Sequence, residues 1–470
     1  MISHCTYLSK KSAFIVAIIW VSLSAQPSTP GRTITDKAGL TSVKVNRIVC
    51  PANVTELQKL VQDSSGPLSI AGSRYSQGGH IAYPEGLVID MSRLSNIISL
   101  DTEKKSLTVE AGATWRSVLN YIDRYDLSVK VMQSYEDFSV GGSLSVNIHA
   151  RDINYGTMIS TVESLTILLA NGQLVKANRS ENPDLFYAAI GGYGLFGIII
   201  TATLSLTDNV RLRREIKPID SFDYSRIFLK VQQDSHTVFQ NADLYPPNFL
   251  KGSSITWRKS AESLTTSHRL QGDVHNEAPL KGLEKMVGKH SFLHKARPFL
   301  SRASEFTDKV VLRNYEMSHS VKHLTISRNH TTSKTLQEYF VPMNRYHNAL
   351  EAITKTLTHY NVNVLNLSVR FVPKDSEPIL SYARQDSFAF VLYISVPNSL
   401  EGKKELNRWT RRLVTKILAL NGTYYLPYAL SASREQFYKA YPRYQHFREL
   451  KDLYDPHHRF RNMLWKNYFE

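Results

Sequence analysis

The sequence predicts an α+β protein of more than one domain. Its 470 residues, 42% of them hydrophobic, are enough to bury a large core and to form two or three domains. Residues 44–208 alternate strand-like and helix-like stretches, and a second such block spans residues 209–420. The last stretch, 421–470, is too small to fold alone, so we expect it to pack back onto the first domain.

The first block opens with a helix and continues with short strands. Asn53 followed by Glu56 is typical of a helix N-cap, and the apolar residues that follow fall on one helical face. The run Ser64–Pro67 ends this helix. Strands are then expected at 68–70, 87–90 and 107–111, and a second helix is expected from Trp115 to Ile122.

A hairpin is expected at residues 163–177. Two apolar runs flank Asn171-Gly172, and this dipeptide favours the positive φ values of a type I′ turn. The β-branched run 198–206 then closes a first domain of antiparallel strands. Strand-like runs at 338–341, 362–371 and 388–396 belong to the second block, which we interpret as a cap domain.

Three glycine-rich segments in the first block point to anion binding. They are residues 71–79, 139–149 and 191–197. Glycines let backbone N–H groups approach an anion closely, and neighbouring hydroxyls add donors, so such loops suit a pyrophosphate. Any one segment alone is equally compatible with a tight turn at a sheet edge.

Two common nucleotide-binding folds are excluded. Gly192 to Gly197 fits the pattern Gly-x-Gly-x-x-Gly, but it precedes a β-branched run rather than opening a helix, so the context of a Rossmann loop is missing. A phosphate-binding loop with its lysine is also absent from the sequence.

These motifs resemble a known family. Four motifs follow the order seen in FAD-linked oxidases of the vanillyl-alcohol-oxidase or p-cresol-methylhydroxylase type: the first glycine loop, Val140-Gly-Gly with Asn147-x-His149, Leu169-Ala-Asn-Gly-Gln, and Asn182 through Ile199. The resemblance covers roughly residues 44–208. Residues 337–342, 422–427 and 454–460 look most like the decaprenylphosphoryl-ribose oxidase branch.

The resemblance implies an FAD-binding domain of the p-cresol-methylhydroxylase (PCMH) type in two parts, 44–208 and 421–470, with an inserted α+β substrate or cap domain at 209–420. It implies that the first loop wraps the FAD pyrophosphate, that Gly141 and Gly142 pass close to the cofactor, and that Tyr425 closes the site near the flavin. The full set of cofactor-binding residues implied in this way is Gly72, Ser73, Arg74, Tyr75, Ser76, Gln77, Gly78, Val140, Gly141, Gly142, Asn147, His149, Ile199 and Tyr425.

The chain departs from the pattern of the family it resembles at three positions. Many relatives carry in the first loop a histidine that bonds covalently to the flavin, whereas Tyr75 stands here, so we expect noncovalent FAD. In the decaprenylphosphoryl-ribose branch a lysine occupies the position of Tyr428, and a glycine the position of Ala150. These departures put the substrate of that branch in doubt.

The chemistry implied is oxidation of a CH–OH carbon of a sugar or lipid-linked phosphosugar, with hydride transfer to flavin N5 and electrons passed to oxygen or another acceptor. His149 is a candidate base or polar clamp, or only a structural hydrogen-bonding residue. Tyr428 is a second candidate base, or an aromatic wall of the site. The alternatives are a soluble sugar-lactone oxidase of the aldonolactone type and a non-catalytic exported flavin-binding protein.

Residues 1–25 have the layout of a secretory signal or an uncleaved anchor: two lysines, a short apolar stretch, then small residues. We therefore expect an exported protein.

The formal charge of +16, concentrated in part between Lys281 and Arg328, favours an anionic substrate or peripheral membrane contact. Nucleic acid is not an expected partner, because no nucleic-acid motif accompanies the charge, and no metal site is expected.

Overall fold

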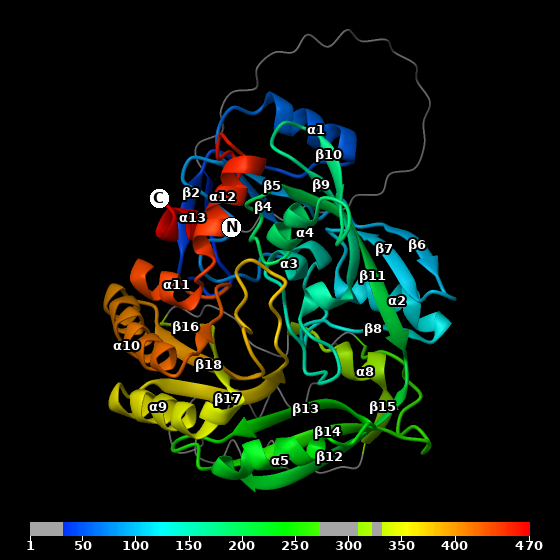
Figure 1. The fold of residues 1–470 in the computed structure, drawn as a ribbon, viewed down its shortest axis with the longest axis vertical. Helices are drawn as coiled ribbons and strands as arrows, with labels where there is room; N and C mark the ends of the chain where they lie inside the picture. The colour runs from blue at the N-terminus through cyan, green and yellow to red at the C-terminus, as the bar shows by residue number, and fades with distance from the viewer. Residues whose placement is uncertain (1–31, 273–308, 322–330) are drawn as a thin grey trace. The chain divides into compact units, whose positions relative to one another are not determined.

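The small sheet at the start of the fold is parallel. The computed structural model describes residues 32–272, 309–321 and 331–470 (Figure 1). After the hairpin β1 (Arg32–Thr35) and β2 (Ser42–Val45), strands β3 (Arg47–Val49), β4 (Leu68–Ala71) and β5 (Leu87–Asp90) pair in the order β3-β5-β4. Helix α1 (Val54–Asp63) makes the crossover that parallel pairing requires. The expectation of antiparallel strands throughout this domain is therefore wrong.

Helix α1 begins where the sequence predicts. The Asn53 side chain accepts a hydrogen bond from the Glu56 backbone N–H at 2.9 Å, and Glu56 in turn accepts one from the Ala52 backbone N–H at 2.7 Å. Leu57 and Val61 are fully buried on the face of the helix that meets the sheet.

A second, antiparallel sheet of six strands completes the first domain. Its strands are β6 (Ile97–Asp101), β7 (Ser106–Glu110), β8 (Leu127–Val129), β9 (Val162–Leu168), β10 (Leu174–Ala177) and β11 (Ile198–Asp208). The order is β10-β9-β11-β7-β6, and β8 pairs with the far end of β11. Helices α2 (Trp115–Ile122), α3 (Val140–Ser145) and α4 (Pro183–Ala189) and two 3-10 turns, Asp123–Tyr125 and Met158–Thr161, connect the strands.

The predicted hairpin is confirmed as β9 and β10, but its turn differs from the predicted one. A type I′ turn needs a positive φ at both central residues. Here only Gly172 has one, at +84°, whereas Asn171 does not. The Gly172 N–H donates to the Leu169 carbonyl at 3.0 Å, and the Asn171 side chain accepts from the Gln173 N–H at 3.0 Å. Because Asn171 uses its side chain to close the loop, the turn needs only one left-handed residue.

The second domain contains one antiparallel sheet of eight strands. These are β12 (Arg211–Asp220), β13 (Thr237–Leu244), β14 (Lys251–Lys259), β15 (Lys309–Leu312), β16 (Thr332–Pro342), β17 (Asn363–Val372), β18 (Ser387–Pro397) and β19 (Thr423–Tyr424), in the order β15-β12-β14-β13-β17-β18-β16-β19. The three strands predicted here lie in β16, β17 and β18. Its helices are α5 (Tyr224–Val231), α8 (Arg313–Met317), α9 (Tyr346–His359) and α10 (Leu400–Ala419), with short 3-10 turns at Ser221–Asp223 and Met343–Arg345.

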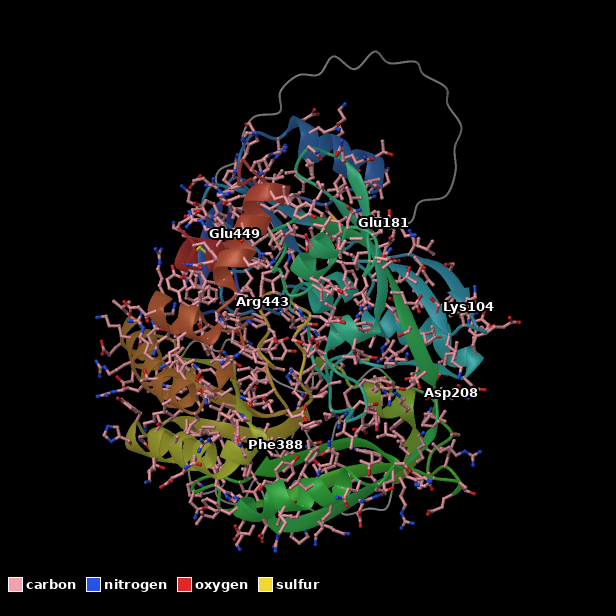
Figure 2. All side chains as sticks on the ribbon, viewed as in Figure 1. Lys104, Glu181, Asp208, Phe388, Arg443 and Glu449 are labelled. Carbon is pink, nitrogen blue, oxygen red and sulfur yellow. The ribbon has the colours of Figure 1, made fainter. Side chains whose placement is uncertain are left out.

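Helices cover one face of the sheet. Helices α9 and α10 pack against the part of the sheet that contains β16 and β18 (Figure 1). Phe388 of β18 is fully buried (Figure 2), where it contacts Tyr224 of α5 and Tyr346 of α9. Charged residues such as Lys104, Asp208 and Glu449 stand at the periphery (Figure 2). The predicted α+β fold class is confirmed.

The C-terminal segment 421–470 contacts both domains. After β19, which belongs to the eight-stranded sheet, it contains α11 (Arg434–Ala440), α12 (Tyr444–Tyr454) and α13 (Met463–Tyr468). Helix α11 packs against α10 of the second domain, and the residues that follow it pack against the first domain. The Leu68 N–H of β4 donates to the Arg459 carbonyl at 2.7 Å, and the Arg461 N–H donates to the Leu68 carbonyl at 2.9 Å. Residues from opposite ends of the chain thus lie side by side, as the blue and red ribbons show (Figure 1).

A buried ion pair holds this segment in place. Lys451 lies in α12 and Asp455 directly follows the helix. The two side chains are fully buried and form a salt bridge. The Lys451 ammonium also donates to the carbonyls of Leu195 at 2.5 Å and Phe460 at 2.8 Å. Burial lowers the pKa of Lys451 to about 8, with Asp455 acting in the opposite direction.

Asp455→Asn should destabilise the chain by about 3–5 kcal/mol, because it leaves the Lys451 charge buried without a counter-charge. Urea unfolding followed by circular dichroism measures the change. Glu449→Gln, on the exposed side of the same helix (Figure 2), is the control and should change the free energy of unfolding by less than about 0.5 kcal/mol. Equal stability of the two variants would show that the pair does not anchor the segment.

Candidate active site

A cleft in the described residues lies between the glycine loops of the first domain and strand β16 with the segment that follows β19. The space free of protein atoms in it, counted together with the open solvent at its mouth, is about 1190 Å³. Its lining comes from residues within the segments 70–77, 138–148, 193–199 and 425–428, though not from every residue of each, together with His80, Ile81, Met91, Ala111, Gln133 and Leu336.

Ser139 joins the first two glycine loops. Its side-chain oxygen accepts hydrogen bonds from the backbone N–H groups of Ser73 and Gly142, both at 3.3 Å, and caps helix α3. A β-carbon at residue 72 would collide with this oxygen, and one at residue 142 would lie 2.9 Å from it. Glycine is therefore required where the two backbones approach one another.

The third loop lies beside the other two. Gly194 has a φ of +72°, and a β-carbon there would lie 3.2 Å from Ile70 of β4. Gly197 has a φ of +151°, and a β-carbon there would lie 2.7 Å from the Leu168 carbonyl oxygen. Gly194, Gly197 and Ile199 line the cleft, so all three predicted glycine segments meet at one site.

The first loop also carries polar side chains into the cleft. Arg74 pairs with Asp90 at the end of β5. The ring of Tyr75 packs edge-on against Phe138 at 4.6 Å, and burial, followed by the charge of Asp137, raises its pKa to about 12. Gln77 is buried and accepts hydrogen bonds from the Thr335 hydroxyl and the Leu336 N–H of β16, at 2.6 and 3.0 Å.

His80, which was not predicted as a site residue, also lines the cleft. Burial lowers its pKa to about 4, while a hydrogen bond to the Leu426 carbonyl at 2.8 Å acts in the opposite direction. The ring is therefore neutral near pH 7 and donates its Nε2–H to that carbonyl.

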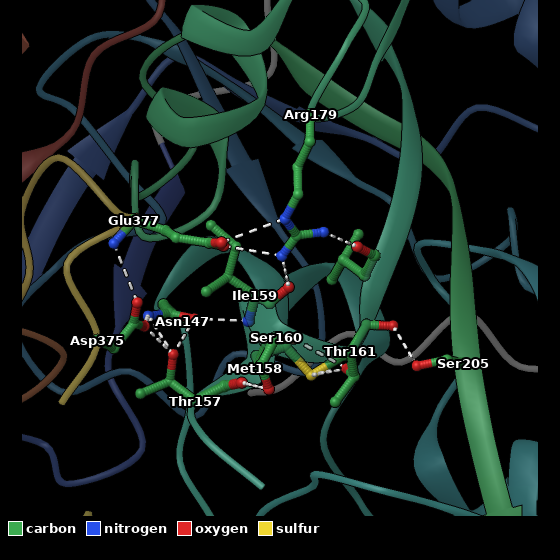
Figure 3. A network of polar contacts seen from close by, with 11 residues as sticks. Asn147, Thr157, Met158, Ile159, Ser160, Thr161, Arg179, Ser205, Asp375 and Glu377 are labelled. Atoms are coloured by element: carbon green, nitrogen blue, oxygen red, sulfur yellow. Dashed lines mark hydrogen bonds and ion pairs between the residues drawn. The ribbon is translucent and has the colours of Figure 1, made fainter. Parts of the chain in front are cut away.

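Asn147 supports the cleft wall from behind. Its φ is +46°, and its side chain accepts from the Ile159 N–H at 3.0 Å and donates to Thr157 at 2.9 Å and to Asp375 at 3.2 Å (Figure 3). Asp375 belongs to the β17–β18 connection, and burial raises its pKa. The same network includes Glu377, which pairs with Arg179 of the first domain (Figure 3). Val146 and Ile148, on either side of Asn147, reach the cleft.

His149 lies behind the same wall. Its Nε2 is 2.6 Å from Glu338 Oε1, and both side chains are buried. The His149 Nδ1 is 3.4 Å from the Ala150 carbonyl oxygen. Glu338 is on β16, so this contact joins the first domain to the eight-stranded sheet.

Two tyrosines from the returning segment close the cleft. The Tyr425 hydroxyl donates to the Val146 carbonyl at 3.0 Å, and its ring meets Tyr428 at 5.8 Å. Tyr428 lies close enough to the Glu338 carboxylate to feel its charge. Burial first, and then the negative charge of Glu338, raise the pKa of Tyr428 well above its ordinary value.

The structure brings most of the predicted residues to the cleft. Those that line it are Gly72, Ser73, Arg74, Tyr75, Ser76, Gln77, Gly141, Gly142, Ile199, Tyr425 and Tyr428. Four others lie outside its lining: Gly78 packs against the Tyr428 carbonyl, Val140 is in the core, and Asn147 and His149 stand behind the wall. The sequence did not predict that Glu338, Gln133 and Leu336 would lie at or beside the cleft. Glu338 belongs to the stretch 337–342, which resembles known relatives, but no neighbouring residue indicated that its side chain would face His149.

The described residues contain no group of three or more His, Cys, Asp or Glu side chains that could hold a metal ion. In the same part of the chain, no helix combines the length and the apolar character needed to cross a membrane. The expected secretory segment 1–25 and the basic cluster Lys285–Arg302 lie outside the described residues.

The cleft fits FAD. Its lining is mostly apolar, as the flavin ring requires, and the three loops meet where added β-carbons would clash, which leaves backbone N–H groups and small hydroxyls as the available donors. The residues that would hold the two-phosphate bridge are Gly72 to Gln77 together with Gly141 and Gly142.

Comparison with known proteins agrees with this fit. Residues 45–178 match the family described as "FAD binding domain", and residues 286–468 match the family described as "D-arabinono-1,4-lactone oxidase". The second match contains β16, Tyr425 and Tyr428, and Leu336, Tyr425 and Tyr428 line the cleft.

Several curated proteins are similar to the chain. L-gulonolactone oxidase of Bos taurus is 23% identical over 432 residues, which cover 88% of this chain and 92% of that protein. Cytokinin dehydrogenase 2 of Arabidopsis thaliana is 28% identical over 40% of this chain and 38% of its own length. D-arabinono-1,4-lactone oxidase of Yarrowia lipolytica is 32% identical over 33% of this chain and 30% of its own length.

Gly72→Ala should weaken FAD binding at least about tenfold, equivalent to about 1.4 kcal/mol, because the new β-carbon displaces the Ser139 oxygen from its two backbone donors. Flavin fluorescence during titration with FAD measures the dissociation constant. Gly66→Ala is the matched control, since a β-carbon there meets nothing within 4 Å. Equal affinity in the two variants would show that the junction of the loops does not hold the cofactor.

Proposed function

Because the chain belongs to the FAD-dependent oxidases with a PCMH-type FAD-binding domain, we propose that it oxidises a CH–OH carbon of a sugar lactone. The chain is an FAD-dependent oxidoreductase and an enzyme, and its substrate is a small molecule. The proposal concerns the chemical class of that substrate and the residues that act on it.

The observation that carries this proposal is that the cleft lining comes from two parts of the chain that match two different families. The first two glycine loops lie in the part of the chain that matches an FAD-binding family, and Leu336, Tyr425 and Tyr428 lie in the part that matches a lactone oxidase family. The similarity to L-gulonolactone oxidase runs through both parts. Substrate identity in such a cleft depends on the wall opposite the cofactor, so the second match bears most directly on the substrate.

The residues divide the work. The first loop, Gly141 and Gly142 bind the cofactor's phosphates, and Asn147 fixes the backbone of the wall between Val146 and Ile148. FAD, when bound, accepts a hydride from the substrate carbon. Tyr428 lies on the cleft wall, where its hydroxyl can hold the substrate hydroxyl, and Tyr425 closes the site against water. His149 stays a proposed contributor to proton transfer from behind the wall.

A lipid-linked phosphosugar is the alternative substrate. The basic cluster Lys285–Arg302, which favours an anionic substrate, lies outside the described residues, and Tyr428 stands where the decaprenylphosphoryl-ribose branch carries a lysine. Export of the protein and peripheral contact with a membrane are retained as proposals that rest on residues 1–25 and on the charge of +16.

Sugar lactones should bleach the flavin spectrum of the purified protein under anaerobic conditions. Aldonolactones are expected to reduce the flavin fastest, while polyprenyl phosphosugars leave it oxidised; absorbance near the flavin maximum follows the reaction. Reduction by polyprenyl phosphosugars but not by any lactone would contradict the proposed substrate class.

Acid precipitation should release the flavin into the supernatant, because Tyr75 stands where relatives carry the attached histidine and cannot form that bond. Absorbance of the two fractions measures the release. Yellow colour retained in the washed pellet would instead reveal a covalent bond to another residue.

A further inference from the structure

Gln133 lines the cleft and is anchored to the interior of the first domain. It lies in the segment between β8 and α3 and is half-buried. Its side-chain oxygen Oε1 accepts a hydrogen bond from the indole N–H of Trp115 at 2.9 Å and another from the Ser143 hydroxyl at 2.9 Å. Trp115 and Ser143 are both fully buried, so one end of the amide is held inside the protein.

These contacts fix which way the amide of Gln133 faces. An indole N–H can only donate a hydrogen bond, so the Gln133 atom that meets Trp115 is the oxygen and not the nitrogen. The oxygen and the nitrogen of an amide point in different directions from their shared carbon, so Nε2 is turned away from Trp115 and Ser143. Among the residues that the structure describes, none accepts a hydrogen bond from this Nε2, and the atom keeps some accessible surface. Gln133 therefore has an N–H donor left for a molecule bound in the cleft.

The amide is also fixed relative to the glycine loops. The Ser143 hydroxyl lies 2.9 Å from the Ser139 carbonyl oxygen as well, and Ser139 joins the first two loops. The Trp115 backbone N–H donates to the Phe138 carbonyl at 3.0 Å, which ties the start of α2 to the segment before α3. The protein thus sets the direction of the Gln133 donor before a ligand arrives, so little ordering is needed when the ligand binds.

The ring carbonyls of a flavin are the acceptors that suit this donor. The two-phosphate bridge of FAD is charged, and the backbone N–H groups of the glycine loops are available to it. The flavin ring instead carries two neutral carbonyl groups, and the lining of the cleft is mostly apolar. A carbonyl oxygen that leaves water for such a place needs a hydrogen-bond donor there. A neutral amide supplies this donor without adding a charge.

We propose that the Nε2–H group of Gln133 donates a hydrogen bond to a carbonyl oxygen of the flavin ring when FAD is bound. The reduced ring carries more negative charge than the oxidised ring, and part of this charge falls on its carbonyl oxygens. A donor held there stabilises the reduced form more than the oxidised form. Gln133 is therefore a cofactor-binding residue that raises the reduction potential of the flavin. This inference depends on FAD binding and is independent of the sugar lactone.

The test uses the full chain, stripped of flavin and refilled with FAD, and the variant Gln133→Glu. This change keeps an oxygen for Trp115 and Ser143 but replaces the N–H donor with a second oxygen. We expect the dissociation constant for FAD, from flavin fluorescence, to rise on the order of tenfold or more. The midpoint potential, from anaerobic equilibration with a reference dye, should become more negative than in the wild type. Gln133→Met, which removes the donor without adding a charge, should shift both quantities in the same direction by less.

Lowering the pH separates a lost donor from a damaged fold. Protonation gives the new carboxyl group of Gln133→Glu an O–H donor, so its loss relative to the wild type at the same pH should shrink between about pH 8 and about pH 5. Trp115 and Ser143, which hold this side chain, do not titrate in that range. Gln133→Met has no group to protonate and should keep its loss at every pH. The same pH dependence in both variants would contradict the donor role.

ADP identifies the part of FAD that Gln133 contacts. It carries the two phosphates and lacks the flavin, so its affinity, from competition with FAD, should stay within about twofold of wild type in both variants. An equal loss for ADP and FAD would show that the amide serves the phosphates, and it would overturn the inference. Wild-type affinity for FAD and a wild-type potential in both variants would also overturn it, and a change confined to lactone affinity would then identify the substrate as the partner.

A matched control and a second variant guard against effects on folding. Gln233→Met changes an exposed glutamine directly after α5 and should keep the wild-type affinity and potential. Should Gln133→Met fail to fold because Trp115 and Ser143 lose their acceptor, Gln133→Glu keeps that acceptor and still tests the donor. A wild-type protein that no sugar lactone bleaches would refute the proposed function, whereas the FAD titrations would still decide the role of Gln133.

Discussion

The close approach of two backbones at Ser139 is the constraint on which the rest of the site depends. One hydroxyl accepts hydrogen bonds from the first glycine loop and from the start of α3, and no side chain fits at residue 72 between them. Because β4, which leads into the loop, is paired both to β5 and to the returning C-terminal segment, the loop is held from two directions. The cofactor site is therefore a product of the whole first domain rather than of one motif.

The second domain is tied to this site by a few buried polar contacts. Gln77 of the first loop accepts hydrogen bonds from Thr335 and Leu336 of β16, His149 meets Glu338 two residues further along that strand, and Asp375 reaches Asn147 from the next connection (Figure 3). Each contact is polar and is buried or partly buried, where an unpaired partner would be costly. Such contacts fix the wall opposite the glycine loops, so cofactor and substrate surfaces keep one relative geometry.

Local chemistry made much of the first domain predictable. The Asn53 cap, the β9–β10 hairpin and the three glycine segments each depend on residues close together in sequence, and the structure contains all of them. The parallel pairing of β3, β4 and β5 was missed, because short apolar strands look alike in either direction. Glu338 was missed because its partner His149 is 189 residues away, and only the folded sheet brings them together. For the same reason the sequence could not indicate that His149 lies behind the wall rather than on it.

The most direct test of the account is a titration of flavin-stripped, folded protein with FAD and, separately, with riboflavin, which lacks the two-phosphate bridge. Flavin fluorescence gives both dissociation constants. If the three loops hold that bridge, one FAD binds per chain with a dissociation constant of about 1 μM or tighter, and riboflavin binds at least about 100-fold more weakly. Equal affinity for the two flavins, or a folded chain that binds neither, would contradict it.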